Sequence, residues 1–174
     1  MKIAIVKLSA LGDIIHAMVV LQFIKKHDPE IIIDWVVDET CNELLESHPD
    51  INKVHSVSLQ KAKKQKSLFI LLKELKKVTR FGEYDVVIDM QGLIKSAVIS
   101  RLISSPITLG FDKSSVRESI SSVFYNQKFK YSYEKNVVER NLALIANFFN
   151  LTVSKENIIN KYFFLYSSQK YNFN

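Results

Sequence analysis

Short apolar segments rich in isoleucine and valine alternate with segments of helical apolar spacing along most of the chain. The segments expected to form strands are residues 2–7, 31–37, 53–57, 84–89 and 106–110. The segments expected to form helices are residues 13–27, 39–47, 67–81, 93–103 and 136–149. Strands that alternate with helices at this spacing predict an α/β fold, a Rossmann-like doubly wound parallel sheet with right-handed crossovers.

The turns that follow the expected strands are the first place to look for a site, because ligands of such sheets bind beyond the carboxyl ends of the strands. These turns are residues 8–13, 37–40, 58–66 and 90–92. Asp13 stands where the N-cap or first turn of a helix is expected, a position that favours an anion. Residues 58–66 are expected to be a polar, basic loop, and residues 114–125 to be helical or irregular. Residues 162–174 show no clear element.

The positive charge is concentrated in one segment. The net charge is +6, but residues 61–80 alone hold eight basic residues and one acidic residue, which leaves the rest of the chain near −1. A basic patch of this kind binds phosphates of a lipid, a nucleic acid or a membrane surface.

The sequence gives little support for a metal site, a disulfide or a membrane-spanning segment. Cys41 is the only cysteine, which excludes an internal disulfide and a cysteine-rich zinc site. The histidines at 16, 27, 48 and 55 lack metal-ligand spacing, so neither a metal nor a cofactor is expected. No apolar run reaches the roughly 18 residues that span a bilayer and no signal peptide is evident, so a cytoplasmic location is expected.

Several motifs in order resemble one enzyme family. They are residues 7–16 (KLSALGDIIH), 34–39 (DWVVDE) and 85–97 (DVVIDMQGLIKSA), then Arg117-Glu118, Phe124-Tyr125-Asn126 and Val138-Glu139-Arg140. The chain resembles the ADP-heptose-dependent glycosyltransferases of the lipopolysaccharide inner core, and within them the heptosyltransferase I group. The resemblance covers residues 1–150.

The resemblance implies the GT-B architecture, in which two Rossmann-like domains face each other across a cleft. Residues 1–160 are then expected to be the amino-terminal, acceptor-binding domain, and residues 161–174 an interdomain or tail segment. The carboxyl-terminal donor domain is expected to be absent from this chain, so the chain supplies only part of a catalytic unit.

The implied reaction moves heptose from ADP-heptose to a hydroxyl of 3-deoxy-manno-octulosonic acid (Kdo) on Kdo-lipid A, with inversion by direct displacement. ADP-heptose would be held mainly by the absent domain. The chain would touch the inner membrane peripherally, through charge, and would not bind nucleic acid.

The resemblance assigns Asp13 the role of catalytic base, because a carboxylate can take the proton from a sugar hydroxyl as it attacks. A plain helix N-cap is the alternative. Ser9 and Gly12 share its turn, where Gly12 would allow close backbone approach to a ligand or a positive φ, or simply form the turn. The sequence LSALGD is not GxGxxG, so a dinucleotide fingerprint is missing.

Basic residues supply the remaining acceptor contacts that the resemblance implies. Lys61, Lys63, Lys64 and Lys66 would hold the lipid A phosphates, unless they form only a solvated loop. Lys95, Arg117 and Arg140 match the acceptor region, and the two arginines would grip the Kdo carboxylate in fork geometry, unless they are surface residues. Gln91, next to Asp89 at a strand exit, would face the acceptor, with turn stabilisation as the alternative role for Asp89.

Three other interpretations stay open on the sequence alone. The chain could belong to heptosyltransferase II or another member of the same family, although the run DMQGLIKS favours heptosyltransferase I. A non-catalytic Rossmann-like module could use the basic patch to bind nucleic acid or anionic membrane, although Phe69 is the only aromatic residue within it. The chain could also be a truncated product with no activity of its own.

Overall fold

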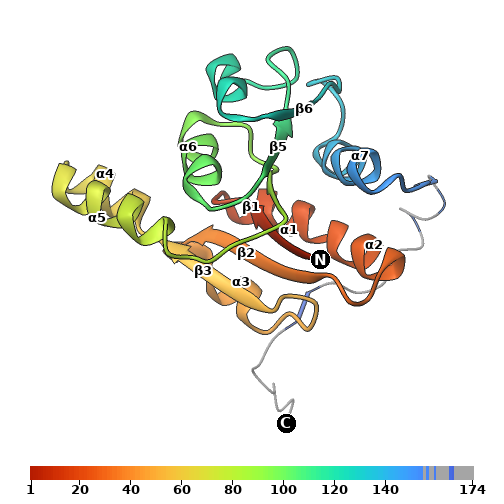
Figure 1. Ribbon diagram of the computed structural model, residues 1–174, viewed down its shortest axis with the longest axis horizontal. Coiled ribbons are helices and arrows are strands. Elements are labelled where there is room, and N and C mark those ends of the chain that lie inside the picture. The colour runs from red at the N-terminus through yellow and green to blue at the C-terminus, as the bar shows by residue number, and fades with distance from the viewer. Residues whose placement is uncertain (155, 157–158, 160–164, 167–174) are drawn as a thin grey trace, which may run out of the picture.

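The computed structural model describes residues 1–154, 156, 159, 165 and 166, which form one parallel sheet covered by helices on both faces (Figure 1). The sheet has six strands in the order β3-β2-β1-β4-β5-β6, and every neighbouring pair is parallel. The strands are β1 (Lys2–Val6), β2 (Ile32–Asp38), β3 (Lys53–Val57), β4 (Val86–Asp89), β5 (Ile107–Phe111) and β6 (Gln127–Phe129). The predicted doubly wound α/β fold is therefore confirmed.

The helices divide between the two faces of the sheet. They are α1 (Leu11–Met18), α2 (Val20–His27), α3 (Glu43–Glu46), α4 (Leu59–Lys64), α5 (Leu68–Val78), α6 (Ile94–Leu102) and α7 (Val137–Phe149), with short 3-10 helices η1 (Glu39–Cys41) and η2 (Ser119–Phe124). Helices α1, α2, α3 and α7 build one hydrophobic core, while α5 and α6 build the other.

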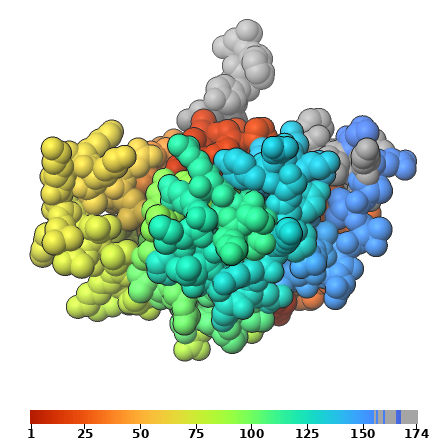
Figure 2. All heavy atoms as spheres, turned by 90° about the horizontal axis from the view of Figure 1, so that it is seen from above, coloured from red at the N-terminus to blue at the C-terminus, as the bar shows by residue number. Residues whose placement is uncertain are grey.

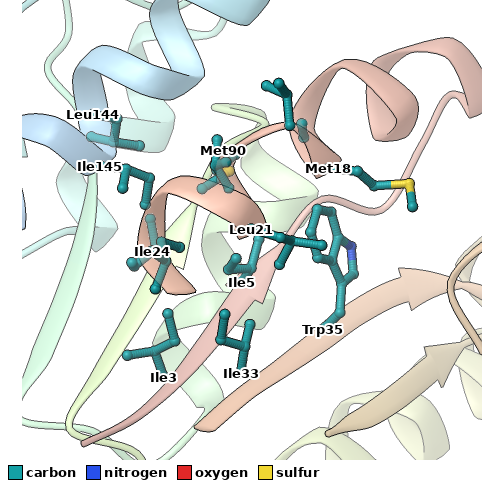
Figure 3. Packing of buried hydrophobic residues seen from close by; sticks show 14 of the residues in the cluster. Ile3, Ile5, Met18, Leu21, Ile24, Ile33, Trp35, Met90, Leu144 and Ile145 are labelled. Atoms are coloured by element: carbon teal, nitrogen blue, oxygen red, sulfur yellow. The ribbon is translucent and has the colours of Figure 1, made fainter. Parts of the chain in front are cut away.

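The central strand β1 serves both cores because its side chains alternate between the faces. Ile3 and Ile5 point into the larger core, where they meet Leu21 and Ile24 of α2 and Ile145 of α7 (Figure 3). Ala4 and Val6 point into the smaller one. All four are fully buried, which explains why this strand reads as a continuous apolar run.

The structure corrects several expected elements. The predicted helix 13–27 is two helices interrupted at Val19, and the first begins earlier, at Leu11, so Gly12 lies inside a helix. The segment expected to be a basic loop contains α4, and the short edge strand β6 was not expected. Weak local signals explain these differences: α4 has only six residues and β6 only three.

Helix α5 also differs from its predicted amphipathic pattern. Leu71, Leu75 and Val78 turn toward the molecule, as their spacing predicts. Leu68 and Leu72 share that spacing, yet they are 68% and 57% exposed, because the first turns of α5 extend beyond the sheet. The two leucines are therefore surface residues.

The strand order fixes where a ligand crevice lies. The chain winds outward from β1 through β2 to β3, and then returns to place β4 on the other side of β1. The helices that follow β1 and β4 consequently leave in opposite directions, which opens a crevice at the carboxyl ends of these strands.

Candidate functional site

A cavity of about 390 Å³ opens at this crevice, among the first turn of α1, the end of β5 and the start of α7. It is lined by Lys7, Asp13, Met90, Gln91, Leu93, Phe111, Arg117, Tyr133, Lys135, Val137, Arg140 and Asn141. Four predicted site residues thus meet in one cavity: Asp13, Gln91, Arg117 and Arg140. We call it the Asp13 cavity.

Asp13 lies in the first turn of α1 with an exposed side chain. The N-cap position belongs to Ala10, whose side chain cannot cap the helix, so the N-cap alternative for Asp13 is wrong. No described side chain donates a hydrogen bond to the Asp13 carboxylate. Its oxygens are therefore available to a ligand, and the helix N-terminus keeps them in a field that favours the anion.

Lys7 is a cavity residue that the sequence analysis did not assign to the site. It follows β1 directly, is 4% exposed, and donates from Nζ to the Met90 carbonyl at 3.1 Å. Burial lowers the pKa of Lys7, while the carboxylates of Asp13 and Asp89 oppose that shift. A lysine that directly follows a buried apolar strand could have indicated this site residue, because burying an ammonium group is costly unless carboxylates lie nearby.

Asp89 organises the turn at the floor of the crevice. Its Oδ1 accepts hydrogen bonds from the backbone N–H groups of Gln91 at 2.7 Å and Gly92 at 3.1 Å, and its Oδ2 accepts from Tyr125 Oη at 2.8 Å. Burial raises the pKa of Asp89, which these bonds counteract. The turn-stabilising role considered for Asp89 is therefore the one that the geometry supports.

Gln91 connects this turn to the one after β1. Its Oε1 accepts from the Leu8 backbone N–H at 2.8 Å, and its Nε2 donates to Ser9 Oγ at 3.4 Å. Ser9 Oγ also accepts from Lys95 Nζ at 2.9 Å. Ser9, Gln91 and Lys95 therefore form a polar cluster beside the cavity, although only Gln91 lines it.

Arg140 holds the outer wall of the cavity. Its guanidinium lies between the rings of Phe111 and Tyr133, at 4.8 and 4.7 Å from their centroids. The two terminal nitrogens donate to the backbone carbonyls of Tyr133 and Ser115. The expected fork grip by Arg140 therefore does not fit this arrangement, because both prongs are already occupied.

Unpaired donors remain in this wall. Arg140 Nε and Asn141 Nδ2 are buried and have no hydrogen-bond partner among the described residues. Burying a donor without a partner is unfavourable, so both groups favour a ligand that brings acceptor oxygens.

Arg117 is an exposed residue that lines the cavity. Its sequence neighbour Glu118 is engaged elsewhere, since Glu118 Oε2 accepts from the backbone N–H of Ile94 at 2.7 Å at the start of α6. Arg117 is therefore a surface residue, as the alternative has it, and it also lines the Asp13 cavity. Arg117 is the arginine whose fork stays available for a carboxylate.

Gly12 does not have the positive φ that the sequence analysis considered. It lies in α1, and a Cβ built at this position would meet nothing within 4 Å. Close approach of a ligand to its backbone is the remaining functional explanation. Gly92 behaves differently, with φ of +69° and a built Cβ only 2.6 Å from Val116 Cγ1.

The predicted phosphate-binding lysines lie outside the Asp13 cavity. All four are exposed on α4 and the turn after it. Lys63 and Lys66, together with Lys95 of α6, line a second hollow of about 440 Å³, whose other lining residues are mostly apolar. Lys95 therefore lies between this hollow and the cluster beside the Asp13 cavity.

A buried polar network at the opposite end of the sheet resembles a site but is internally satisfied. Asp34 accepts from Asn52 Nδ2 and Tyr84 Oη, both at 2.7 Å, and pairs with Lys2 and His55, both at 3.5 Å. Burial raises the pKa of Asp34, but these partners outweigh it and hold that pKa well below the ordinary 3.8.

Metal-binding clusters and membrane-spanning helices are both absent from the part of the chain that the structure describes. No group of three or more His, Cys, Asp or Glu side chains is positioned there to hold a metal ion. None of the helices found there is long and apolar enough to cross a membrane.

Comparisons with known proteins place this geometry in a family. The model of glycosyltransferase family 9 (heptosyltransferase) matches residues 72–166. Lipopolysaccharide heptosyltransferase 1 of Campylobacter coli is 47% identical over 150 residues, which cover 86% of this chain and 42% of that protein. The Pseudomonas aeruginosa enzyme of the same name is 34% identical over 151 residues, covering 84% and 42%.

A solved structure agrees with these sequence matches. The Escherichia coli heptosyltransferase WaaC with ADP-2-deoxy-2-fluoro heptose superimposes with a TM-score of 0.81 at 31% identity, over 89% of this chain and 50% of that one. The chain thus spans about half the length of the relatives that it matches.

Proposed function

The chain belongs to glycosyltransferase family 9, and we propose that it is the amino-terminal, acceptor-binding half of a heptosyltransferase. The proposed reaction moves heptose from ADP-heptose to Kdo of Kdo-lipid A in lipopolysaccharide inner-core synthesis. The proposal assigns residues 1–160 to the acceptor domain and the donor site mainly to a second domain. The end of that range and the segment 161–174 fall largely outside the described residues.

The observation that carries the proposal is the composition of the Asp13 cavity. It places a carboxylate without internal hydrogen bonds beside the free fork of Arg117 and the unpaired donors of Arg140 and Asn141. A sugar acid presents a hydroxyl that must lose a proton, and a carboxylate that needs donors. The cavity offers a group of each kind.

In the proposed step, the acceptor hydroxyl oxygen forms a bond to the anomeric carbon of the heptose. The bond between that carbon and the phosphate oxygen breaks, and ADP leaves with the bonding electron pair. The proton of the hydroxyl passes to Asp13. Lys7 lies close enough to Asp13 for the two side chains to interact electrostatically.

The other predicted site residues take supporting roles in this proposal. Arg117 binds the Kdo carboxylate, while Ser9, Gln91 and Lys95 position the turn that carries Asp13. Gly12 allows the ligand to approach the α1 backbone. Lys61, Lys63, Lys64 and Lys66 bind lipid A phosphates, and the chain works in the cytoplasm at the periphery of the inner membrane.

A chimera tests the proposal. Residues 1–150 of this chain would be joined to the carboxyl-terminal half of the Campylobacter coli relative, and heptose transfer from ADP-heptose to Kdo-lipid A would be measured. We expect transfer that is lost on Asp13→Asn. A folded chimera that transfers heptose only to an acceptor already carrying the first heptose would favour a heptosyltransferase II-like function instead.

A further inference from the structure

The first turns of α5 expose apolar side chains that the Asp13 cavity does not use. Leu68, Phe69 and Leu72 are 68%, 78% and 57% exposed. They stand next to the turn that joins α4 to α5, and we call them the apolar patch. Helices α4 and α5 project beyond the sheet as one lobe at the end of the molecule (Figures 1 and 2).

Positive charge surrounds the apolar patch almost without opposition. The exposed basic residues of α4, α5 and their flanks are Lys61, Lys63, Lys64, Lys66, Lys73, Lys76, Lys77 and Arg80. Glu74 is the single acidic residue of this stretch, and it is 8% exposed. It accepts from the Ser58 backbone N–H at 3.0 Å and pairs with Lys77 at 3.7 Å. The surface of the lobe is therefore apolar and cationic.

Helical geometry places both kinds of side chain on one side of α5. Positions 68, 72 and 76 follow one another at intervals of four within α5, so they lie along one stripe of the helix. The stripe begins with Leu68 and Leu72 and ends with Lys76, and Arg80 follows just beyond the end of the helix. An exposed helix stripe that combines apolar and basic residues matches the interface of an anionic bilayer, where phosphates lie above acyl chains.

The hollow beside the patch has the same character. Its lining combines apolar side chains with basic ones and one serine: Leu59, Ala62, Leu68 and Leu71, then Lys63, Lys66 and Lys95, and Ser67. An apolar chain below a phosphate would satisfy both parts. Because Lys95 also donates to Ser9 Oγ, a lipid held here lies on the side of the molecule that leads to the Asp13 cavity.

We propose that the α4–α5 lobe docks this chain on the surface of an anionic lipid bilayer, with the apolar patch inserted among the acyl chains and the lysines at the level of the phosphates. The inference rests on the proposed function only in that a lipid acceptor is reached at a membrane. It requires no acceptor lipid, and it adds apolar insertion to a contact otherwise expected from charge alone.

Co-sedimentation of the 174-residue chain with vesicles tests the docking. The vesicles contain phosphatidylcholine with or without phosphatidylglycerol, and no acceptor. We expect binding to the mixed vesicles only, weakened by salt. The triple variant L68S/F69S/L72S should lower the affinity about tenfold or more, because it removes the inserted apolar area. The matched control I120S/V123S changes two other exposed apolar residues, on η2, and should bind like the unchanged chain.

A fluorescence measurement separates insertion from simple adsorption. The variant Phe69→Trp should shift its emission to the blue on mixed vesicles and be quenched by lipids brominated in the acyl chain, whereas Val123→Trp should not respond.

Equal vesicle binding by the triple variant, or an unresponsive Trp at position 69, would overturn the inference. So would sedimentation showing that the apolar patch pairs two copies of the chain without binding vesicles. None of these outcomes bears on heptose transfer, which the chimera tests with the acceptor present.

Discussion

The two ends of the parallel sheet carry similar polar residues in opposite states. At the amino-terminal end, the Asp34 carboxylate is 1% exposed and surrounded by donors from Asn52, Tyr84, Lys2 and His55. At the carboxyl-terminal end, the Asp13 carboxylate is exposed and accepts no hydrogen bond from a described side chain. An aspartate at the end of a strand or the start of a helix is therefore not, by itself, evidence of a functional site.

Hydrogen-bond capacity is what distinguishes the two ends. Asp34 and its partners satisfy one another's hydrogen-bonding groups, and this network contributes to stability. Around Asp13, Arg117 is exposed, and the buried Arg140 Nε and Asn141 Nδ2 have no hydrogen-bond partner among the described residues. Groups held in place but left unpaired lower the cost of binding, because they need no rearrangement.

The largest effect is expected from a change of Asp13, at the carboxyl-terminal end of the sheet. In the chimera, Asp13→Asn should lower kcat for heptose transfer by about 10²–10⁴-fold, the range of general base catalysis, with the melting temperature unchanged. The isosteric change removes the proton acceptor but no internal hydrogen bond. Glu43→Gln, on the exposed surface of α3, is the control and should keep full activity. Unchanged turnover in Asp13→Asn would show that another group takes the proton.

The same Asp-to-Asn change at the amino-terminal end of the sheet should lower stability and leave acceptor binding intact. We expect Asp34→Asn to lower the free energy of unfolding at neutral pH by about 2–4 kcal/mol, since it removes the charge that the network was built around. Acceptor binding by the refolded protein should be unaffected.

The stability difference between the unchanged chain and Asp34→Asn should depend on pH in a definite direction. Because the folded state lowers the pKa of Asp34 below 3.8, its contribution is present above that pH and is lost as the pH falls below it. Melting curves of both proteins from neutral to acidic pH should therefore converge under acidic conditions. A constant difference across the range would contradict the role given to the network.

A pair of glycines sharpens the contrast between fold and site. Gly92→Ala should destabilise the chain by about 1–3 kcal/mol, because φ is +69° and the new Cβ would collide with Val116. Gly12→Ala should leave stability unchanged or slightly raised, since it replaces a glycine in a helix with open space around it. Acceptor binding should nonetheless weaken in Gly12→Ala. Thermal melting and titration of both variants would show whether Gly12 serves the ligand alone.

The smallest effect is expected from the lysines of α4. The double variant K63Q/K64Q should weaken binding of a phosphorylated acceptor by several-fold and make it less sensitive to salt, as exposed charges do. K113Q/K128Q removes two exposed charges elsewhere and should change neither quantity. If both variants behave alike, net charge rather than the lysine segment determines binding.

Much of this architecture was predictable because periodicity and turn position are local properties. The strand segments and the crevice rule predict the turns that carry Asp13 and Gln91, whereas Arg117 is predicted only by the family resemblance. Segment 162–174, where the sequence indicates a boundary, lies almost entirely outside the described residues.

Features that depend on tertiary context were not predictable. The spacing of Leu68 and Leu72 indicates core positions, but the start of α5 extends beyond the sheet. The burial of Lys7 follows from packing. The occupied fork of Arg140 depends on two carbonyls from separate segments of the chain, those of Ser115 and Tyr133.

Calorimetric titration of the chain with deacylated Kdo-lipid A, and separately with ADP-heptose, at low and high salt is the most direct test of the central claim. We predict salt-sensitive binding of the acceptor, about tenfold or more weaker in Arg117→Gln, with little binding of ADP-heptose. A folded chain that binds the acceptor equally well with and without Arg117, or that binds only the donor, would contradict the assignment of the Asp13 cavity as the acceptor site.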